Sequence, residues 1–474
     1  MACASAGKRD MMNQSGHGGD VPVAKRRRCV EPAGAAAAGI PEDIAEQILL
    51  RLPVKSILRF RSVCKSWRAM VADPRFVRLQ LHHSTTAARH RPPSMLVLPH
   101  WSMPELRMGT IGFFRYPGHG AAAELAHERA WSSIVSDDYG AAAADWAADD
   151  DADADDDEDT DADDDGDAAD GRDCYDDWDQ PLHCNGLVLL CSVMKNSTLM
   201  LVCNPATKEI AELPACTPDY FTEPRVGFYA DQSTGKIKVV HCFIRQCDET
   251  CTDYSVGCEV LSLGSPSPAW RPVADPPYLL GFGPASPCIL GGIYWIASLP
   301  SPPTGSCTAP GMLRFDVRNE EFADFPCPPC MDVFNTTRTM TELAGKLCYS
   351  HLAAGDKIEL WIASAAADGD EDEGGGGPSW SLHCAVVLPQ PINNIFPFAD
   401  DYQGGGVFFN VHFAVICRYD TERQVVEHVV DMNNEMTYFR SRSTHKLYDR
   451  NRVGGKWMHH VIPYRESLVS IKAN

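Results

Sequence analysis

The sequence predicts an α+β multidomain protein, in which a small helical module precedes a mainly antiparallel β body. Between residues 40 and 83 the apolar side chains recur at the spacing of a helix. After about residue 90 the chain changes to short β-rich runs that Gly, Pro, Asn and Asp separate. These runs form a loose repeat of about 50 residues, and units of that length with several antiparallel strands are typical of β-propeller blades.

The helical module contains residues that favour the ends of helices. Pro41 suits a first helical position, and the two acidic residues after it place negative charge near the positive end of the helix dipole. Two apolar sets at helical spacing follow: Ile44, Ile48, Leu49 and Leu52, then Val63, Trp67, Met70 and Val71. We expect residues 54–60 between them to form a short turn. Pro53 ends the first set, and Asp73-Pro74 ends the second, because the residue before proline is disfavoured in the α region. We expect three short helices in residues 39–83.

The β body repeats two sequence features. The first is a glycine followed by apolar residues, at Gly186, Gly292 and Gly345. These glycines are 106 and 53 residues apart, so one further repeat is expected between the first two. The second feature is a strand, a polar turn and a strand, as in Val202–Ile210, Phe315–Phe322 and Tyr419–Val425. We expect the β body to occupy residues 90–474, with a number of blades that these degenerate repeats do not fix.

Three further segments have the composition of solvated, disordered chain. Residues 1–38 form a basic tail, residues 140–179 form an acidic insert, and residues 366–378 form a loop rich in Gly and acidic residues. The formal net charge is −22, but 20 acidic residues and one arginine within 145–179 contribute −19 of it. The acidity is therefore local, and it says nothing about the charge of a substrate.

The sequence has no feature of a membrane or secreted protein. It has no run of 18 apolar residues, so no membrane span is expected. The N-terminus lacks the apolar region of a secretory signal, which favours the nucleus, the cytoplasm or both. The 19 cysteines are then expected to be reduced thiols, and the sequons at Asn196 and Asn335 to be chance matches.

Two short motifs have the spacing of metal or redox sites. Residues 161–166 match the opening of an EF-hand calcium loop, but its twelfth position is Arg172 instead of glutamate. Cys327-Pro-Pro-Cys330 lies in a proline-rich stretch and not at a helix N-terminus, where the dipole would lower a thiol pKa. A zinc site would need a second ligand pair, for which Cys247, Cys251 and Cys258 offer only loose spacing. We therefore expect no metal site and no cofactor.

No catalytic residue can be selected from the sequence. It has no nucleophile elbow, no phosphate-binding P-loop and no zinc-protease motif. The histidines His183, His241, His351 and His412 are scattered, and each is expected to be a packing or surface residue. We expect a protein that is not an enzyme, with a propeller enzyme that uses an unrecognised site in its central channel as the alternative.

Basic residues raise the alternative of a DNA- or chromatin-binding protein. Between residues 51 and 78 there are eight basic residues and one acidic residue, which would suit a helix-turn-helix unit. Against this, the connection Leu52-Pro53-Val54 is apolar, and no polar set at the last helix is arranged for base edges. Nucleic acid is therefore not the expected partner. In the tail, Lys25, Arg26, Arg27 and Arg28 are a candidate nuclear-import signal, with a merely solvated tail as the alternative.

The surplus of apolar residues in the helical module favours a protein partner. At least ten large apolar residues lie within the 24 positions from 44 to 67, more than a three-helix unit of this size can bury. Exposed apolar surface on a small helical unit is a signal of partner binding. We therefore interpret the basic residues as the solvated flank of a docking surface.

The same residues resemble a known family. The module contains Ile40-Pro-Glu-Asp-Ile44, Ile48-Leu-Leu-Arg-Leu-Pro53, Val54-Lys-Ser-Ile-Leu-Arg-Phe60, Arg61-Ser-Val-Cys-Lys-Ser-Trp67 and Asp73-Pro-Arg-Phe76. In this order they resemble an F-box of the type abundant in plants, with Met70-Val71 where the family more often has Leu and Ile. Val226–Val240 and Pro463–Ile471 are similar to parts of the F-box-associated region of such proteins.

The resemblance implies a partner and a role. An F-box docks a Skp-type adaptor and through it a cullin–RING ubiquitin ligase, for which the chain would be the receptor of a protein substrate. The resemblance places Leu52 and Pro53 at the adaptor contact. The residues implied either at that contact or in packing beneath it are Ile44, Ile48, Leu49, Val54, Ile57, Leu58, Val63 and Trp67. How they divide between contact and packing is left open, and no feature names the substrate.

Overall fold

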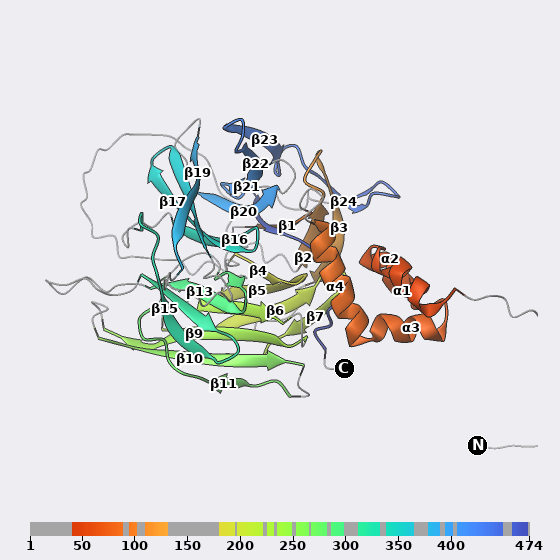
Figure 1. Ribbon diagram of the computed structural model, residues 1–474, viewed down its shortest axis with the longest axis horizontal. Coiled ribbons are helices and arrows are strands. Elements are labelled where there is room, and N and C mark those ends of the chain that lie inside the picture. Colours follow the sequence, from red (N-terminus) through yellow and green to blue (C-terminus); the bar gives the residue numbers. More distant parts are fainter. Residues whose placement is uncertain are drawn as a thin grey trace, which may run out of the picture. The chain divides into compact units, whose positions relative to one another are not determined.

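The computed structural model describes most of the chain between residues 40 and 472 (Figure 1). The described ranges are 40–88, 94–101, 110–130, 180–194, 197–220, 225–231, 235–248, 253–264, 267–281, 286–297, 311–331, 338–364, 378–388, 394–401, 405–448 and 457–472. The predicted basic tail, the acidic insert with its EF-hand-like residues, both sequons, Cys251 and the Gly/acidic loop up to residue 377 lie outside these ranges. The domain boundaries stay predictions.

The helical module contains one helix more than the sequence predicted. Its helices are α1 (Glu42–Leu50), α2 (Val54–Phe60), α3 (Lys65–Ala72) and α4 (Pro74–Ala88). The residues expected as a short turn, Val54–Phe60, form α2, and Asp73-Pro74 both ends α3 and begins α4. Asp73 Oδ1 accepts a hydrogen bond from the backbone N–H of Arg75 at 2.7 Å, and Pro74 occupies the first position, where its missing N–H costs nothing.

No helix in the described part of the chain combines the length and the apolar character that crossing a bilayer requires.

The β body is a six-bladed β-propeller, as the repeat of about 50 residues predicted. Five of its sheets take four consecutive strands each. They are β4 (Leu182–Cys184), β5 (Leu187–Met194), β6 (Ser197–Asn204) and β7 (Glu209–Glu212); β8 (Arg225–Ala230), β9 (Ile237–Cys247), β10 (Tyr254–Leu263) and β11 (Trp270–Pro272); β12 (Cys288–Ile289), β13 (Gly292–Ile296), β14 (Met312–Asp316) and β15 (Glu321–Phe325); β16 (Thr339–Leu343), β17 (Lys346–Ala354), β18 (Lys357–Ala363) and β19 (Trp380–Val387); and β20 (Ile395–Asp401), β21 (Gly406–Val411), β22 (Val415–Asp420) and β23 (Val425–Asp431).

Both predicted repeat features are turns within these sheets. Where the first strand meets the second, Asn185 and Gly186 have φ of 52° and 81°, and Ala344 and Gly345 have 52° and 78°. Two successive residues with positive φ make the tight turn that fits the twist of a hairpin. The corresponding turn glycine between β12 and β13 is Gly291, one residue before the predicted Gly292. The hidden repeat is the sheet β8–β11.

The second repeat feature is a side chain that closes the turn before the fourth strand. Asn204, Asp316 and Asp420 each accept hydrogen bonds through Oδ1 from the backbone N–H groups two and three residues further on, at 2.9 to 3.3 Å. Asn and Asp favour turns because their short side chains can make these local bonds. The polar turns predicted from the sequence therefore have one physical basis in three blades.

The sixth sheet joins the two ends of the propeller. Its strand order is β25 (Lys446–Leu447), β24 (Thr437–Ser441), β3 (Ala122–Ala130), β2 (Thr110–Tyr116), β1 (Met95–Trp101) and β26 (Trp457–Pro463). Strand β26 pairs antiparallel with β1 along its whole length, from Met95↔Pro463 to Trp101↔Trp457. The last strand of the chain therefore closes the ring against the first.

The chain after β26 stays attached to the propeller, and we call residues 457–472 the closing segment. Asn204 Nδ2 donates to the carbonyl oxygens of Ser467 and Val469 at 3.1 and 2.8 Å. Glu209 Oε2 accepts from the backbone N–H of Ile471 at 2.8 Å. The side chains of Val469 and Ile471 are buried in the core beside β5, β6 and β9.

The approach of the closing segment to Gly186 gives a test of this packing. A Cβ on Gly186 would lie 2.5 Å from the carbonyl oxygen of Arg465, whereas a Cβ on Gly345 would have nothing within 4 Å. Both glycines have positive φ, so alanine at Gly345 should cost roughly 1–2 kcal/mol from backbone strain alone. Alanine at Gly186 should cost a further ~1–3 kcal/mol from overpacking.

Denaturant unfolding of Gly186→Ala and Gly345→Ala measures this difference directly. Equal losses of unfolding free energy in the two variants would show that the closing segment does not pack against the β4–β5 turn.

Candidate functional site

The apolar side chains of the helical module fall into three classes of exposure. Leu49, Val54 and Ile57 are buried and share one cluster with Val71, Phe76 and, from the closing segment, Leu468. These three residues therefore pack internally, although the sequence had left their role open. Leu52, Leu58 and Trp67 are half-buried at the margin of the same cluster. The Trp67 ring meets Phe60 edge to face, with 5.5 Å between the ring centroids.

The remaining predicted contact residues lie on the surface. The side chains of Ile44, Ile48 and Val63 are 48%, 43% and 59% exposed, and Pro53 is also exposed. Ile44 and Ile48 are one turn apart on α1, and Val63 immediately precedes Cys64, whose Sγ accepts the N–H of Trp67 at the start of α3. Large apolar side chains in contact with water are a signal of partner binding when a small module carries several of them. That they bind an adaptor stays a prediction.

The basic residues of the module are solvated, as the sequence analysis expected. All eight are exposed: Arg51, Lys55, Arg59, Arg61, Lys65, Arg68, Arg75 and Arg78. Where their contacts are defined, these are local: Arg51 donates to the carbonyl of Gln47, and Arg75 lies 3.6 Å from Glu46. The charges therefore flank the apolar surface and do not enter the core.

One acidic residue of the closing segment fixes the module to the propeller. Glu466 Oε2 accepts the backbone N–H of Val54, the first residue of α2, at 3.1 Å. Its Oε1 accepts from Arg115 of β2 at 2.7 Å, and its carbonyl oxygen accepts from Gln80 of α4 at 3.5 Å. A carboxylate satisfies a helix N-terminal donor well, because that donor has no partner within the helix. No sequence pattern could have found this contact, since Val54 and Glu466 are 412 residues apart.

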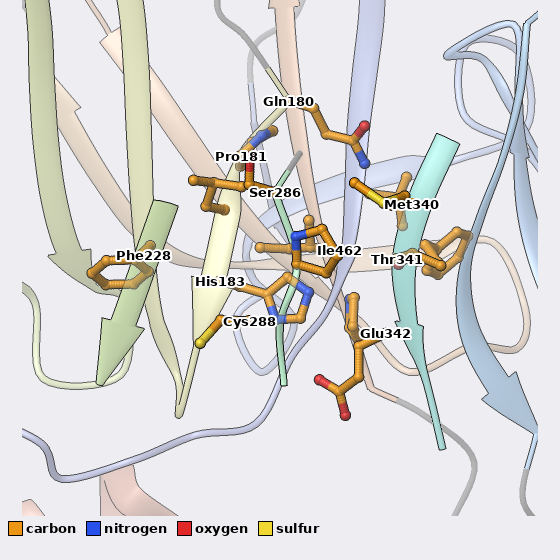
Figure 2. Close-up of a pocket in the computed structure, with 15 residues that line it drawn as sticks. Gln180, Pro181, His183, Phe228, Ser286, Cys288, Met340, Thr341, Glu342 and Ile462 are labelled. Atoms are coloured by element: carbon orange, nitrogen blue, oxygen red, sulfur yellow. The ribbon is translucent and has the colours of Figure 1, made fainter. Parts of the chain in front are cut away.

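The innermost strands of the propeller surround a small pocket (Figure 2). It is lined from β4, β8, β12, β16, β20 and β26, with His183, Cys288 and Glu342 among its polar side chains. Its volume is about 40 Å³, which suits one or two water molecules and no organic substrate. The described part of the channel therefore gives no support to a propeller enzyme.

Burial disfavours the charged forms of titratable side chains on the innermost strands and beside them. It lowers the pKa of His183 to about 4 and raises the pKa of Cys184 to about 12. It also raises the pKa of Glu342, and it raises the pKa of Asp400 to about 6, with a further contribution from the nearby Glu342 carboxylate.

The other histidines and the Cys-x-x-Cys pair remain apart from this pocket. His241 is on β9, His351 is buried on β17 at 3.5 Å from Glu359, and His412 is in the turn after β21. Cys327 Sγ accepts the N–H of Gly311 at 3.1 Å in an irregular segment, and burial raises its pKa. This placement does not activate a thiol, in agreement with the interpretation from sequence.

Sequence reasoning missed one group of potential donor residues. Cys216, His241 and Glu259 each place a ligand-type atom within 4.8 Å of the others. Their positions in the sequence follow no motif spacing, and only the pairing of β9 with β10 brings two of them together.

The raised pKa of Asp400 predicts a dependence of stability on pH. The folded protein holds the Asp400 proton up to about pH 6, whereas the ordinary carboxyl releases it near 3.8, so folding binds a proton in this window. The contribution of the Asp400 carboxyl to the free energy of unfolding is therefore fully present at low pH and is lost as the pH rises from about 4 to 6. Asp400→Asn, which stays neutral, should be more stable than wild type by about 3 kcal/mol at pH 7 and by less than about 1 kcal/mol at pH 4.

Unfolding free energies of the two proteins at both pH values test this. The difference in unfolding free energy between the two proteins at each pH cancels the contribution of His183, whose lowered pKa makes stability rise with pH over a similar window. A difference that is the same at both pH values would contradict the burial of the Asp400 carboxyl.

Comparison with known proteins gives the family of these features. Residues 39–79 match the F-box domain, and residues 164–471 match the F-box associated beta propeller domain. An F-box protein of Arabidopsis thaliana is 23% identical over 345 residues, which cover 69% of this chain and 70% of the relative. An F-box/LRR-repeat/kelch-repeat protein of the same plant is 22% identical over 380 residues, which cover 77% and 80%.

Solved structures overlap less well. TolB from Acinetobacter baumannii covers 74% of this chain and 69% of its own, with 9% identity and a TM-score of 0.34. An oligogalacturonate lyase in complex with manganese covers 59% and 74%, with 11% identity and a TM-score of 0.32. Overlaps at these scores carry no argument about function. The match over 164–471 spans more than half of the chain, which therefore belongs to the family of F-box proteins with an F-box associated beta propeller domain.

Proposed function

We propose that this chain is the substrate-recognition subunit of a cullin–RING, SCF-type ubiquitin ligase. The observation that carries the proposal is the exposure of the large apolar side chains Ile48 and Val63 on a module whose buried apolar side chains already form a core. Because the core does not need these side chains, they are free to dock a Skp-type adaptor. The family match over residues 39–79 supports the same partner.

The mechanism we propose is proximity. An adaptor bound to the helical module and a protein substrate bound to the propeller would share one chain, which raises the effective concentration of substrate lysines near a charged ubiquitin carrier. The chain itself would contribute no catalytic residue, because the ligase partners perform the transfer. The contacts of Glu466 with Val54 and Arg115 support this role, since they limit the motion of the module against the propeller.

We propose that the turns and loops between the strands capture the substrate. Loops on a rigid sheet scaffold vary without disturbing the core, so they are the usual place for recognition. The proposed location is the nucleus, the cytoplasm or both, with Lys25 to Arg28 as the candidate import signal.

A pair of matched variants tests the adaptor surface. Val63 in the module and Val387 on the edge strand β19 are 59% and 63% exposed, so glutamate at either position should leave the fold intact. Val63→Glu should weaken binding of a Skp-type adaptor at least tenfold, or about 1.4 kcal/mol, because it puts a charge into an apolar interface. Val387→Glu should bind as wild type does. Titration calorimetry gives the affinities, and thermal unfolding checks the folds.

Two outcomes would reject the proposal. Wild-type protein that fails to bind the adaptor removes its basis. Binding of duplex DNA that falls steeply with salt, in the absence of adaptor binding, would support the DNA- or chromatin-binding alternative.

A further inference from the structure

Three side chains of the sheet β8–β11 and the segment before it form a compact group. His241 and Glu259 lie directly opposite each other on β9 and β10, and Cys216 lies in the segment that links β7 to β8. The thiol sulfur, an imidazole nitrogen and a carboxylate oxygen are within 4.8 Å of one another. His241 is fully buried, Glu259 is buried and Cys216 is partly exposed, so the group opens to solvent on the side of the thiol.

Glu259 holds the other two members of the group in place. Its Oε1 lies 3.0 Å from His241 Nδ1 and accepts the backbone N–H of Thr217 at 2.8 Å. Its Oε2 accepts the Thr217 hydroxyl at 2.8 Å. Because Thr217 is the neighbour of Cys216, one carboxylate fixes both the imidazole and the chain that carries the thiol. Trp270 Nε1 donates to the carbonyl of Pro214 at 2.8 Å and anchors the same segment.

The imidazole of His241 has one nitrogen without a hydrogen-bond partner. Its ring is packed between Phe243 and Trp270, with ring centroids 5.4 and 5.9 Å away. Nδ1 is bound to Glu259, whereas Nε2 is buried and makes no hydrogen bond among the described residues. Burial opposes charge on this ring, but contact with Cys216 and Glu259 raises the pKa of His241 to about 9. An orienting carboxylate, an imidazole and a thiol are the elements of an activated cysteine.

We propose that Cys216 is an activated thiol, which transfers its proton to His241 and reacts as a thiolate with hydroperoxides. The sulfur attacks the terminal oxygen of the peroxide, so that an S–O bond forms and the O–O bond breaks. The leaving group is the alkoxide of the hydroperoxide, or hydroxide when the peroxide is hydrogen peroxide; it takes the proton of the His241 imidazolium and becomes the alcohol or water. The sulfur is oxidised to a sulfenic acid and the peroxide is reduced, with Glu259 orienting the imidazole throughout.

A metal ion is the competing occupant, and the contacts of Glu259 argue against it. Its two oxygens already receive three hydrogen bonds, from His241 and twice from Thr217. Using this carboxylate as a ligand would break some of them, and a structural zinc site needs four ligands where this group offers three. The activated thiol needs no such rearrangement.

The experiment compares two thiols of the full-length wild-type protein. Cys327 is the matched control, because it is more exposed than Cys216 and lies in a segment where burial raises its pKa. Iodoacetamide at neutral pH, followed by mass spectrometry of each peptide, should label Cys216 at least tenfold faster than Cys327. After treatment with hydrogen peroxide, a sulfenic-acid trap should likewise modify Cys216 faster than Cys327.

Variants separate activation from exposure. His241→Asn should slow the labelling of Cys216 to the rate of Cys327 and leave Cys327 unchanged, and Glu259→Gln should slow it partly. If His241→Asn does not fold, Glu259→Gln and the wild-type ratio still decide the question. Equal rates for the two thiols in wild type overturn the proposal. Stoichiometric zinc that protects Cys216 until a chelator removes it also overturns it, in favour of a metal site.

Discussion

The pairing of β26 with β1 is the constraint on which the rest of the structure depends. A propeller must join its last blade to its first, and here seven residues from each end of the β body form that joint. The sheet then places the closing segment against Gly186, Asn204 and Glu209. Leu468 enters the core of the helical module, whereas Val469 and Ile471 enter the core beside β5, β6 and β9. Full burial of a side chain of this kind stabilises a fold by roughly 1.5–3 kcal/mol, so this short stretch contributes well beyond its length.

The same segment relates the fold to the proposed function. Leu468 packs with Leu49, Val54 and Ile57, and Glu466 accepts the first N–H of α2. The module therefore completes its core with a side chain that belongs to the ring closure. A receptor that works by proximity gains from such a link, because a captured protein is held where the ligase can reach it.

Features encoded locally could be predicted from the sequence. Asn204, Asp316 and Asp420 form their turns with neighbours two and three residues away, so the repeat could be recognised from the sequence alone. Apolar spacing predicted α1 and α3, but Val54–Phe60 was interpreted as a turn and is α2. Asp73-Pro74 was interpreted only as a helix end, although α4 begins there. Which of Ile48 and Leu49 faces water depends on packing between helices, and no spacing of single residues contains that information.

Features that join distant parts of the chain could not be predicted. The number of blades became clear only when β24, β25 and β26 returned to the sheet of β1. Glu466 and Val54, and likewise Cys216 and Glu259, meet through strand pairing and ring closure, with no sequence signal at either end. The placement of His183 in the central pocket has the same origin, since innermost strands from six sheets line that pocket.

We expect the closed ring and the helical module to unfold as one cooperative unit. Hydrogen exchange across a series of denaturant concentrations below the unfolding transition tests this expectation, because units that open together lose protection together. The amides of α2 and α4 should lose protection at the same denaturant concentration as those of β1 and β26. Loss of protection in the helices at a clearly lower concentration, with β1 and β26 still protected, would contradict it.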